Sequence, residues 1–244
     1  MFKKKKKVIA KAARNLVVEI EPKSSIAEQF RTLRSNIKFS KAEDELRTLL
    51  ITSALPSEGK STVSANLACL FASEGKKVLF IDADMRKPTV QYTFRLFNTT
   101  GLSNVLSKQA ELIEVINDKV GIENLHVITS GPVPPNPSEL LGSIAFERLL
   151  VEAKEHYDII VFDAPPTLSV TDAQIIANRV DGTILVIDTQ YTERKAPEKA
   201  MELLRTAEAQ LLGAVMNNIS TSKNDSYYYN NYYANAYGEE EDKT

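Results

Sequence analysis

The stretch LLITSALPSEGKST, which runs from Leu49 to Thr62, decides the fold of this chain. It begins with an apolar run typical of a buried strand, passes through a tight turn, and ends in GKST, where a helical pattern begins. Such a turn points backbone N–H groups at phosphate oxygens, and the positive end of the helix dipole adds to the attraction. The stretch therefore predicts a phosphate-binding loop, although Ala54 stands where the pattern G-x-x-x-x-G-K-S/T has its first glycine.

Side chains of this loop have predicted roles in binding a nucleotide. Lys60 is expected to reach the β- and γ-phosphates, and Ser61 is expected to place its hydroxyl on Mg²⁺. Glu58, which precedes the glycine of the motif, is included among the expected nucleotide-binding residues. The expected ligands of the loop are therefore ATP and Mg²⁺.

Composition bounds the class of protein. With 244 residues, 43% of them hydrophobic and 25% charged, the chain has the size and balance of one folded α/β domain. Its 30 basic and 32 acidic residues nearly cancel, which argues against a protein that coats nucleic acid. The single cysteine, Cys69, excludes a disulfide scaffold, and we expect it to be a core residue in a cytoplasmic setting. We find no signal peptide and no apolar run near the ~18 residues that a membrane-spanning helix needs, so export and membrane spanning are not expected.

Apolar runs and helical patterns alternate along the chain. Strands are predicted after the first one at residues 78–81, 125–128, 159–162, 184–187 and 211–216, and the clearest helices at 24–39, 138–155 and 195–209. For the helix at 138–155, Asn136 is a candidate cap, Pro137 suits the first turn, and Glu139 completes a capping box. Strands that are apolar on both faces and alternate with helices predict a P-loop NTPase-like parallel sheet covered by helices on both faces.

The two ends of the chain differ in composition from the middle. Residues 1–22 contain the basic run Lys3 to Lys7 and are expected to form a flexible arm. This arm is either a solvated tail or a segment attracted to anionic lipid or an acidic partner. Residues 23–219 are expected to form the folded domain, and residues 220–244, rich in Tyr and Asn, a disordered tail.

The helix predicted at 24–39 has an apolar and a charged face. Its apolar residues recur at helical spacing and are expected to pack inward: Ile26, Phe30, Leu33 and Ile37. Glu28, Arg31 and Arg34 form an E-x-x-R-x-x-R row that is expected to face outward. The row is placed for a partner surface, although such a row by itself is usually only a solvated face.

Aspartates follow two of the predicted strands. Asp82 and Asp84 come after one strand, and Asp163 comes after another. Since the carboxyl ends of parallel strands face the ligand crevice, these aspartates are expected beside the phosphate loop. Asp163 with Ser61 offers the hard oxygen ligands that Mg²⁺ prefers. Asp82 is then expected to orient or deprotonate the attacking hydroxyl, directly or through a metal-bound water, while Asp84 and Arg86 shape the site.

These motifs together resemble those of the bacterial tyrosine kinases. That family carries a Walker A loop, an apolar run followed by D-x-D-x-R, and a Walker B motif that ends in D-x-P-P, which match residues 54–62, 78–86 and 159–166. The stretch GPVPPNPSELL (131–141), the E-x-x-R-x-x-R row and the terminal tyrosines also match, so the resemblance covers nearly the whole chain. It implies a protein-tyrosine kinase that uses ATP and regulates capsular or exopolysaccharide synthesis and export.

The resemblance also implies roles for single residues. It implies nucleotide binding by Gly59, Lys60, Ser61 and Thr62, catalytic roles for Lys60, Asp82 and Asp84, and metal binding by Ser61, Asp82 and Asp163. Related nucleotide-binding folds read adenine with an asparagine after a late strand. That asparagine would be Asn217 here, and the adjacent Asn218 is an alternative.

Tyrosines near the C-terminus are the implied phosphoacceptors. They are Tyr227, Tyr228, Tyr229, Tyr232, Tyr233 and Tyr237. In the family a neighbouring subunit phosphorylates this tail, and the helix with the E-x-x-R-x-x-R row joins the subunits into a ring. Because each phosphate adds roughly 1.5 to 2 negative charges beside the acidic residues 239–242, we expect phosphorylation to loosen the ring. The alternative is that a tail rich in Asn and Tyr is only a self-associating segment.

The resemblance further implies partners outside this chain. A separate membrane-embedded activator would recruit the cytoplasmic kinase to the inner face of the cell membrane. An opposing tyrosine phosphatase and other protein substrates are expected, and a nucleic-acid partner is not.

Two other interpretations remain open at this point. A positioning ATPase of the MinD and ParA kind shares the sheet, the phosphate loop and aspartates in similar places. Those proteins place a signature lysine directly after the first position of the loop, where this chain has Leu55. A nucleotide-regulated scaffold without catalysis would require the aspartates to be merely structural.

Overall fold

The computed structural model describes residues 14–40 and 46–220. In this part of the chain, six strands form one sheet in the order β3-β2-β4-β1-β5-β6, and each neighbouring pair is parallel. The strands are β1 (Thr48–Ser53), β2 (Val78–Asp82), β3 (Leu125–Ile128), β4 (Ile159–Asp163), β5 (Gly182–Asp188) and β6 (Leu211–Asn217). Every strand lies where it was predicted, so the parallel α/β fold is confirmed.

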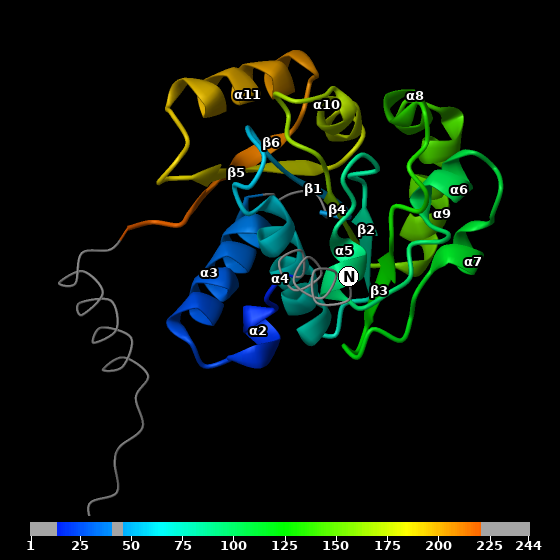
Figure 1. Ribbon diagram of the computed structural model, residues 1–244. Coiled ribbons are helices and arrows are strands. Elements are labelled where there is room, and N and C mark those ends of the chain that lie inside the picture. Colours follow the sequence, from blue (N-terminus) through cyan, green and yellow to red (C-terminus); the bar gives the residue numbers. More distant parts are fainter. Residues whose placement is uncertain (1–13, 41–45, 221–244) are drawn as a thin grey trace, which may run out of the picture.

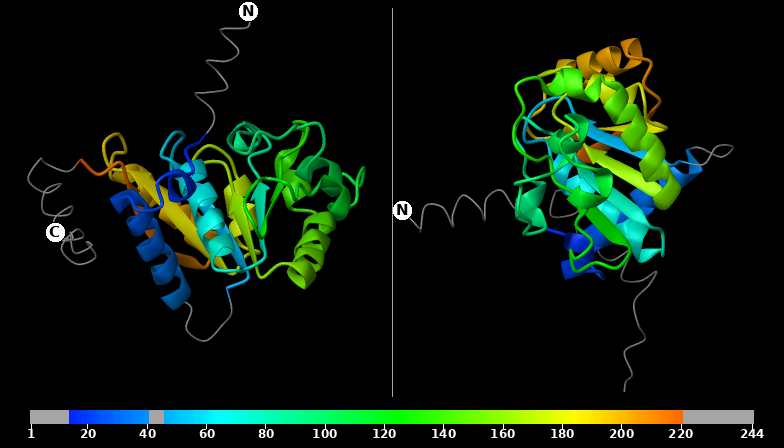
Figure 2. Two further views of the ribbon diagram at one scale, coloured as in Figure 1. Left: turned by 90° about the horizontal axis from the view of Figure 1, so that it is seen from below. Right: turned by 90° about the vertical axis from the view of Figure 1, so that its right-hand side faces the viewer.

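Helices cover both faces of the sheet. They are α2 (Val17–Ile20), α3 (Ser25–Phe39), α4 (Lys60–Ser73), α5 (Val90–Thr93), α6 (Leu102–Leu106), α7 (Leu112–Val115), α8 (Pro137–Leu141), α9 (Ile144–His156), α10 (Asp172–Ala177) and α11 (Lys195–Thr206). Figure 1 shows α3 and α4 on one face and α10 and α11 on the opposite face. The left panel of Figure 2 looks onto the face that α3 and α4 cover.

The core consists of two apolar clusters, one on each face of the sheet. Leu49 and Ile51 of β1 pack in the cluster that includes α4, whereas Leu50 packs in the cluster that includes α9, α10 and α11. Successive strand side chains point to opposite faces, so a strand covered on both sides is apolar at most positions and not at every second one. Cys69 lies fully buried in α4, as predicted, and burial raises the pKa of its thiol.

Helix α3 begins where the sequence predicted, and its inward face matches the prediction except at Ile26. Ser24 caps the helix by accepting a 3.2 Å hydrogen bond from the backbone N–H of Ala27. Ala27 and Ile37 are buried, whereas Ile26 is 52% exposed, so the prediction that Ile26 packs inward is wrong. Phe30 and Leu33 are partly buried and pack against the core cluster that includes α4, as predicted, and Ala27 takes the inward position at the start of the helix.

The folded domain begins earlier in the chain than predicted. Residues 14–22 were expected in a flexible arm, yet α2 packs against α4 and buries Val18. Asn66 of α4 accepts a hydrogen bond from Val18 N–H and donates one to the carbonyl of Asn15. These contacts attach the segment to the domain, which could not be read from its composition.

The helix predicted at 138–155 is divided into α8 and α9. Gly142 ends α8, and Ser143 adopts an extended backbone conformation (φ −82°, ψ 162°) before α9 begins. Pro137 occupies the first turn of α8 as predicted, but the side chain of Asn136 makes no cap hydrogen bond to the backbone and instead donates to the Glu139 carboxylate. The break gives α8 and α9 different directions.

Several predicted features lie outside the described residues. These are the basic run Lys3 to Lys7 and the tail tyrosines Tyr227, Tyr228, Tyr229, Tyr232, Tyr233 and Tyr237. Among residues 14–40 and 46–220, no helix has both the length and the apolar character needed to cross a membrane.

Candidate nucleotide-binding and phosphoryl-transfer site

The phosphate loop connects the end of β1 to the start of α4. Gly59 precedes α4 with a φ of +96°, a conformation that residues with a side chain rarely adopt. A Cβ atom at this position would lie 2.0 Å from Nδ2 of Asn217. The same Nδ2 donates a 2.9 Å hydrogen bond to the carbonyl of Glu58. Both the backbone angle and the close approach of Asn217 therefore require glycine here.

Lys60 lies at the centre of a polar cluster. Its Nζ atom is 3.3 Å from Asp84 Oδ2 and 3.3 Å from Asp163 Oδ1. The Ser61 hydroxyl lies 3.2 Å from the same nitrogen. Burial by itself lowers the pKa of Lys60, but the carboxylates of Asp163, Asp84 and Asp82 outweigh it and raise the pKa. The lysine is therefore held as a cation at the phosphate loop, beside aspartates that are far away in sequence.

Asp163 and Asp82 end the neighbouring strands β4 and β2 and stand in register. Both side chains are fully buried. Burial raises the pKa of Asp163, while the Lys60 ammonium and the Ser61 hydroxyl oppose the shift. Asp163 Oδ2 is buried without a hydrogen-bond partner among the described residues. A buried carboxylate oxygen of this kind is costly unless it binds a ligand.

Asp82 lies deeper than predicted. Its Oδ1 accepts a 3.1 Å hydrogen bond from the Asp84 N–H, and its Oδ2 accepts 3.2 and 3.1 Å bonds from the N–H groups of Thr89 and Val90. Burial and the neighbouring Asp163 raise the pKa of Asp82 to about 8, against the effect of Lys60. Asp84 lines the cleft described below, and Asp82 does not. Backbone N–H groups thus engage both carboxylate oxygens of Asp82, and its predicted roles in catalysis and metal binding stay predictions.

Glu58 also departs from its predicted role. Its side chain is only 2% exposed and does not line the cleft. Oε2 accepts a 2.5 Å hydrogen bond from Leu55 N–H, and Oε1 accepts bonds from Asp188 N–H at 3.3 Å and the Thr192 hydroxyl at 2.5 Å. The carboxylate therefore fastens the phosphate loop to the segment after β5, and its expected contact with the nucleotide is corrected. The sequence could not reveal this because two of the partners, Asp188 and Thr192, lie about 130 residues away along the chain.

The two candidate adenine-reading asparagines both line the cleft. Asn217 ends β6 and supports the phosphate loop through the Glu58 carbonyl. Asn218 has a φ of +53°, and its Nδ2 donates a 2.6 Å hydrogen bond to Asp188 Oδ2. Of the two, Asn217 is directly attached to the loop.

A cleft of about 740 Å³ lies over these residues. Its wall includes the phosphate loop, the D-x-D-x-R segment, the prolines of D-x-P-P and the end of β6. Charged side chains in the wall are Arg14, Lys60, Asp84, Arg86 and Lys87. Arg14 was not predicted as a residue of the site, because its segment was expected to lie outside the domain.

Arg86 is fixed by a buried carboxylate that was not predicted. Its Nε donates to Asp172 Oδ2 at 2.9 Å, and its Nη2 donates to Asp172 Oδ1 at 3.0 Å. Ser138 donates a 2.7 Å hydrogen bond to Asp172 Oδ1 and accepts one of 2.9 Å from Arg86 Nη2. Hydrogen bonding to Asp172 raises the pKa of Arg86. This network joins the cleft wall to α8 and α10, and it explains why the stretch around Ser138 belongs with the site.

The residues at the loop fit a hard divalent cation. Ser61 and Asp163 provide a hydroxyl and a carboxylate. Asp163 Oδ2 has no hydrogen-bond partner among the described residues, so it is available to bind a metal ion. The described residues contain no group of three or more His, Cys, Asp or Glu that would hold a metal by themselves. Mg²⁺ fits such a site because it commonly takes one or two carboxylates and completes its shell with water and phosphate.

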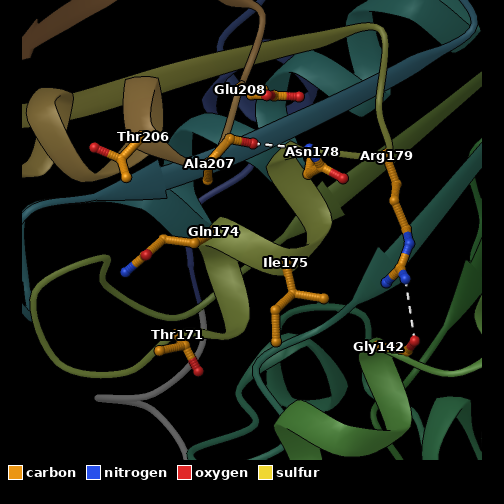
Figure 3. A pocket seen from close by; sticks show the side chains of 9 residues that line it. All are labelled: Gly142, Thr171, Gln174, Ile175, Asn178, Arg179, Thr206, Ala207 and Glu208. Atoms are coloured by element: carbon orange, nitrogen blue, oxygen red, sulfur yellow. Dashed lines mark hydrogen bonds between the residues drawn. The ribbon is translucent and has the colours of Figure 1, made fainter.

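A second cavity, of about 510 Å³, lies between α10, α11 and the α8–α9 junction (Figure 3). Arg179 in its wall donates hydrogen bonds to the carbonyls of Leu141 and Gly142, and Asn178 donates one to the carbonyl of Ala207. None of the predicted site residues lines this cavity. The chemistry therefore belongs to the cleft over the phosphate loop.

The charged row of α3 is divided between two environments. Glu28 and Arg31 form a partly exposed ion pair at 2.6 Å. Arg34 instead lies 2.8 Å from Glu74 Oε1, donates a 3.3 Å hydrogen bond to the Leu70 carbonyl, and is 15% exposed. Arg34 is therefore turned toward its own domain, which corrects the expectation that the whole row faces outward.

Comparisons with known proteins agree with this geometry. A family model described as an AAA domain matches residues 57–211. The chain is 49% identical over 219 residues to the tyrosine-protein kinase YwqD of Bacillus subtilis, covering 88% of this chain and 91% of the relative. It is 48% identical over 214 residues to the putative tyrosine-protein kinase CapB of Staphylococcus aureus, covering 88% and 93%.

Solved structures are similar over most of the chain. The kinase domain of the Escherichia coli tyrosine kinase ETK superposes with a TM-score of 0.79 at 37% identity, covering 86% of this chain and 84% of that one. The MinD protein of Pyrococcus horikoshii in complex with Mg-ADP has a TM-score of 0.60 at 25% identity, covering 73% of each chain. The nucleotide-binding P-loop fold is thus shared with both groups, while the higher identities lie with the kinases. This chain belongs to the bacterial tyrosine-protein kinase family.

Proposed function

We propose that this protein uses ATP to phosphorylate the tyrosines of its own C-terminal segment, in trans within an oligomer. The observation that carries the proposal is the position of the Lys60 ammonium, 3.3 Å from both Asp84 and Asp163 at the phosphate loop. A buried cation between carboxylates beside an anion-binding loop suits the transfer of a phosphoryl group.

The residues of the loop bind and orient the nucleotide. The backbone N–H groups of residues 59–62 take the phosphate oxygens at the start of α4, and Lys60 stabilises the charge that develops on the transferred group. Asn217, which is held against the loop by its bond to Glu58, reads the adenine. Ser61 and Asp163 would hold Mg²⁺, which would neutralise phosphate charge.

The acceptor reaction needs a group that receives a proton. The tyrosine Oη attacks the γ-phosphorus, the bond from that phosphorus to the β–γ bridging oxygen breaks, and ADP leaves. Asp84 lines the cleft, and in this proposal it accepts the phenolic proton. Asp82 holds the backbone of Asp84 through a 3.1 Å hydrogen bond and acts as its positioning residue.

The function in the cell follows from the family. We propose that the kinase regulates capsular or exopolysaccharide synthesis and export. Support comes from CapB and from a solved chimerical protein, CapA2B2, which is 40% identical to this chain with a TM-score of 0.81. A membrane-embedded activator would recruit the kinase to the inner face of the membrane, and a tyrosine phosphatase would reverse the modification. Other protein substrates are also part of this proposal, and nucleic acid is not.

We further propose that Glu28 and Arg31 of α3, with Arg34 supporting the helix, join subunits into a ring that phosphorylation loosens. Each phosphate adds roughly 1.5 to 2 negative charges to the tail, next to acidic residues. Size-exclusion mass should therefore fall after full phosphorylation, and an unchanged mass would contradict this part of the proposal.

A positioning ATPase is the second candidate, favoured only by the fold that MinD shares. Leu55 occupies the position of the signature lysine in that class, and its N–H is used by Glu58. Incubation of the purified protein with Mg-ATP and the cytoplasmic segment of its activator, followed by phosphopeptide mass spectrometry, distinguishes the two. Phosphotyrosine at residues 227–237 is expected from the kinase, whereas ATP hydrolysis without phosphotyrosine would support the alternative.

A further inference from the structure

Positive charge is concentrated on one side of the cleft. Lys60 and Arg86 are balanced by carboxylates inside the domain, namely Asp84 and Asp163 for Lys60 and Asp172 for Arg86. Lys87 is exposed and makes no ion pair with the residues that the structure describes. Asp84 is the carboxylate in the cleft wall, and it already faces Lys60.

The strand order places Lys87 on the side of the cleft where the attacking tyrosine is expected to bind. The phosphate loop follows β1, the candidate adenine-reading Asn217 ends β6, and Lys87 follows β2. In the sheet, β2 and β6 lie on opposite sides of β1. A nucleotide whose triphosphate lies on the loop and whose base lies toward Asn217 leaves the β2 side for the attacking tyrosine. Lys87 is anchored on that side, because its N–H donates a 3.0 Å hydrogen bond to Asp84 Oδ1.

The sequence of this chain contains an acceptor with the opposite charge. Tyr237 is followed, after one glycine, by Glu239, Glu240, Glu241 and Asp242. An extended chain advances roughly 3.3–3.6 Å per residue, so the first of these carboxylates lies about 7 Å along the chain from Tyr237. Acidic residues at this spacing would meet cations at the edge of the cleft while the tyrosine is at its floor.

We propose that Lys87 forms a cationic rim at this edge of the cleft and that this rim selects tyrosines flanked by acidic residues. The substrate class is thus an acidic tyrosine peptide, an inference that rests on the proposed tyrosine kinase function. Phosphorylation supplies further negative charge, roughly 1.5 to 2 charges per group. A phosphorylated Tyr237 therefore becomes an acidic flank for Tyr233, and modification proceeds from the acidic end of the cluster toward Tyr227.

Peptide kinetics test the rim directly. The enzyme is the full chain with the tail tyrosines changed to phenylalanine, so that added peptide is the acceptor. The substrates are the peptide of residues 234–244, ANAYGEEEDKT, a neutral version, ANAYGQQQNKT, and a basic version, ANAYGKKKKKT. Each is assayed with the unchanged rim, with Lys87→Glu, and with the control Lys119→Glu, which alters an exposed lysine outside the cleft.

The rim predicts a change of preference with charge. Screened ion pairs are each worth up to about fivefold in affinity, so the acidic peptide should have a KM roughly 5-fold below that of the neutral one. Lys87→Glu should raise the KM of the acidic peptide roughly 10-fold and improve the basic peptide, with little change in the KM for ATP. Lys119→Glu should behave like the unchanged enzyme. A loss of packing would affect all the peptides alike and would not be rescued by the basic one.

Two outcomes would overturn the rim. One is equal KM values for the acidic and neutral peptides, and the other is an equal rise in the KM for ATP and for peptide in Lys87→Glu, which would place Lys87 on the nucleotide phosphates. Fluorescence anisotropy with labelled forms of the same peptides measures their binding, and so tests the rim separately from the proposed kinase activity. Charge-dependent binding without any phosphotyrosine would contradict the proposed function and leave the rim supported, whereas phosphorylation without charge preference would do the reverse.

Discussion

Removing the carboxylate of Glu58 tests whether this side chain holds the phosphate loop or contacts the nucleotide. In Glu58→Ala, the N–H groups of Leu55 and Asp188 and the hydroxyl of Thr192 lose their acceptor in a site that is 2% exposed. An unsatisfied buried donor costs about 1–3 kcal/mol, and water entering the space left by the side chain recovers part of that cost. We therefore expect the free energy of unfolding of the nucleotide-free protein to fall by roughly 2–4 kcal/mol.

The same change should weaken nucleotide binding indirectly. If about 2 kcal/mol of the ATP binding free energy is used to order the phosphate loop, the Kd for ATP rises roughly 30-fold, since 1.4 kcal/mol corresponds to a factor of ten. Glu58→Gln keeps one acceptor oxygen but turns an NH₂ group toward a donor, so it should fall between the wild type and Glu58→Ala in both measurements.

Urea denaturation without nucleotide and titration with a fluorescent ATP analogue measure the two effects separately. For a domain of this size the expected loss corresponds to a fall in Tm of roughly 5–15 °C. Glu152→Ala, on the exposed face of α9, is the matched control and should remain within about 0.5 kcal/mol of the wild type. A Glu58→Ala protein with wild-type stability and weakened ATP binding would refute the reasoning and return Glu58 to a direct contact with the nucleotide.

Further predictions concern the other parts of the site and the stability of the domain. Gly59→Ala should abolish nucleotide binding, measured by analogue titration, because its Cβ would lie 2.0 Å from Asn217 Nδ2. Lys60→Met should abolish autophosphorylation on a phosphotyrosine immunoblot, whereas changing the tail tyrosines to phenylalanine should leave ATP binding intact. Asp84→Asn should lower kcat at least 100-fold with less than a threefold change in ATP affinity, as expected for loss of a proton acceptor. The pKa of Asp181 is lowered by hydrogen bonds from Thr48 and Arg47 N–H and by Lys154, although burial opposes the shift. Its contribution to the free energy of unfolding is therefore present above the unfolded pKa near 3.9 and is lost as the pH falls through the lower folded pKa. Asp181→Asn should remove this part of the loss of stability at low pH, as measured by urea denaturation at a series of pH values.

The amino-acid sequence determined the fold and the identity of the chemical groups. Continuous apolar runs required strands covered on both faces, because alternating side chains point to opposite sides of a sheet. A phosphate loop after the first run and aspartates after two later runs then had to meet at one edge, because parallel strands end together. Lys60, Ser61, Asp84 and Asp163 are close neighbours for this reason.

The tertiary structure alone decided which of these groups face the cleft and which support it. Glu58 and Asp82 carry the charge that their motifs suggest, yet backbone N–H groups bind their oxygens, from Leu55 and the distant Asp188 for Glu58 and from the turn at Thr89 and Val90 for Asp82. Arg14 and Asp172 join the site through contacts of α2 and α10 that no local pattern encodes. Local spacing specifies the element on which a side chain stands, but the direction of a carboxylate depends on which donors the packed chain brings within about 3 Å of it.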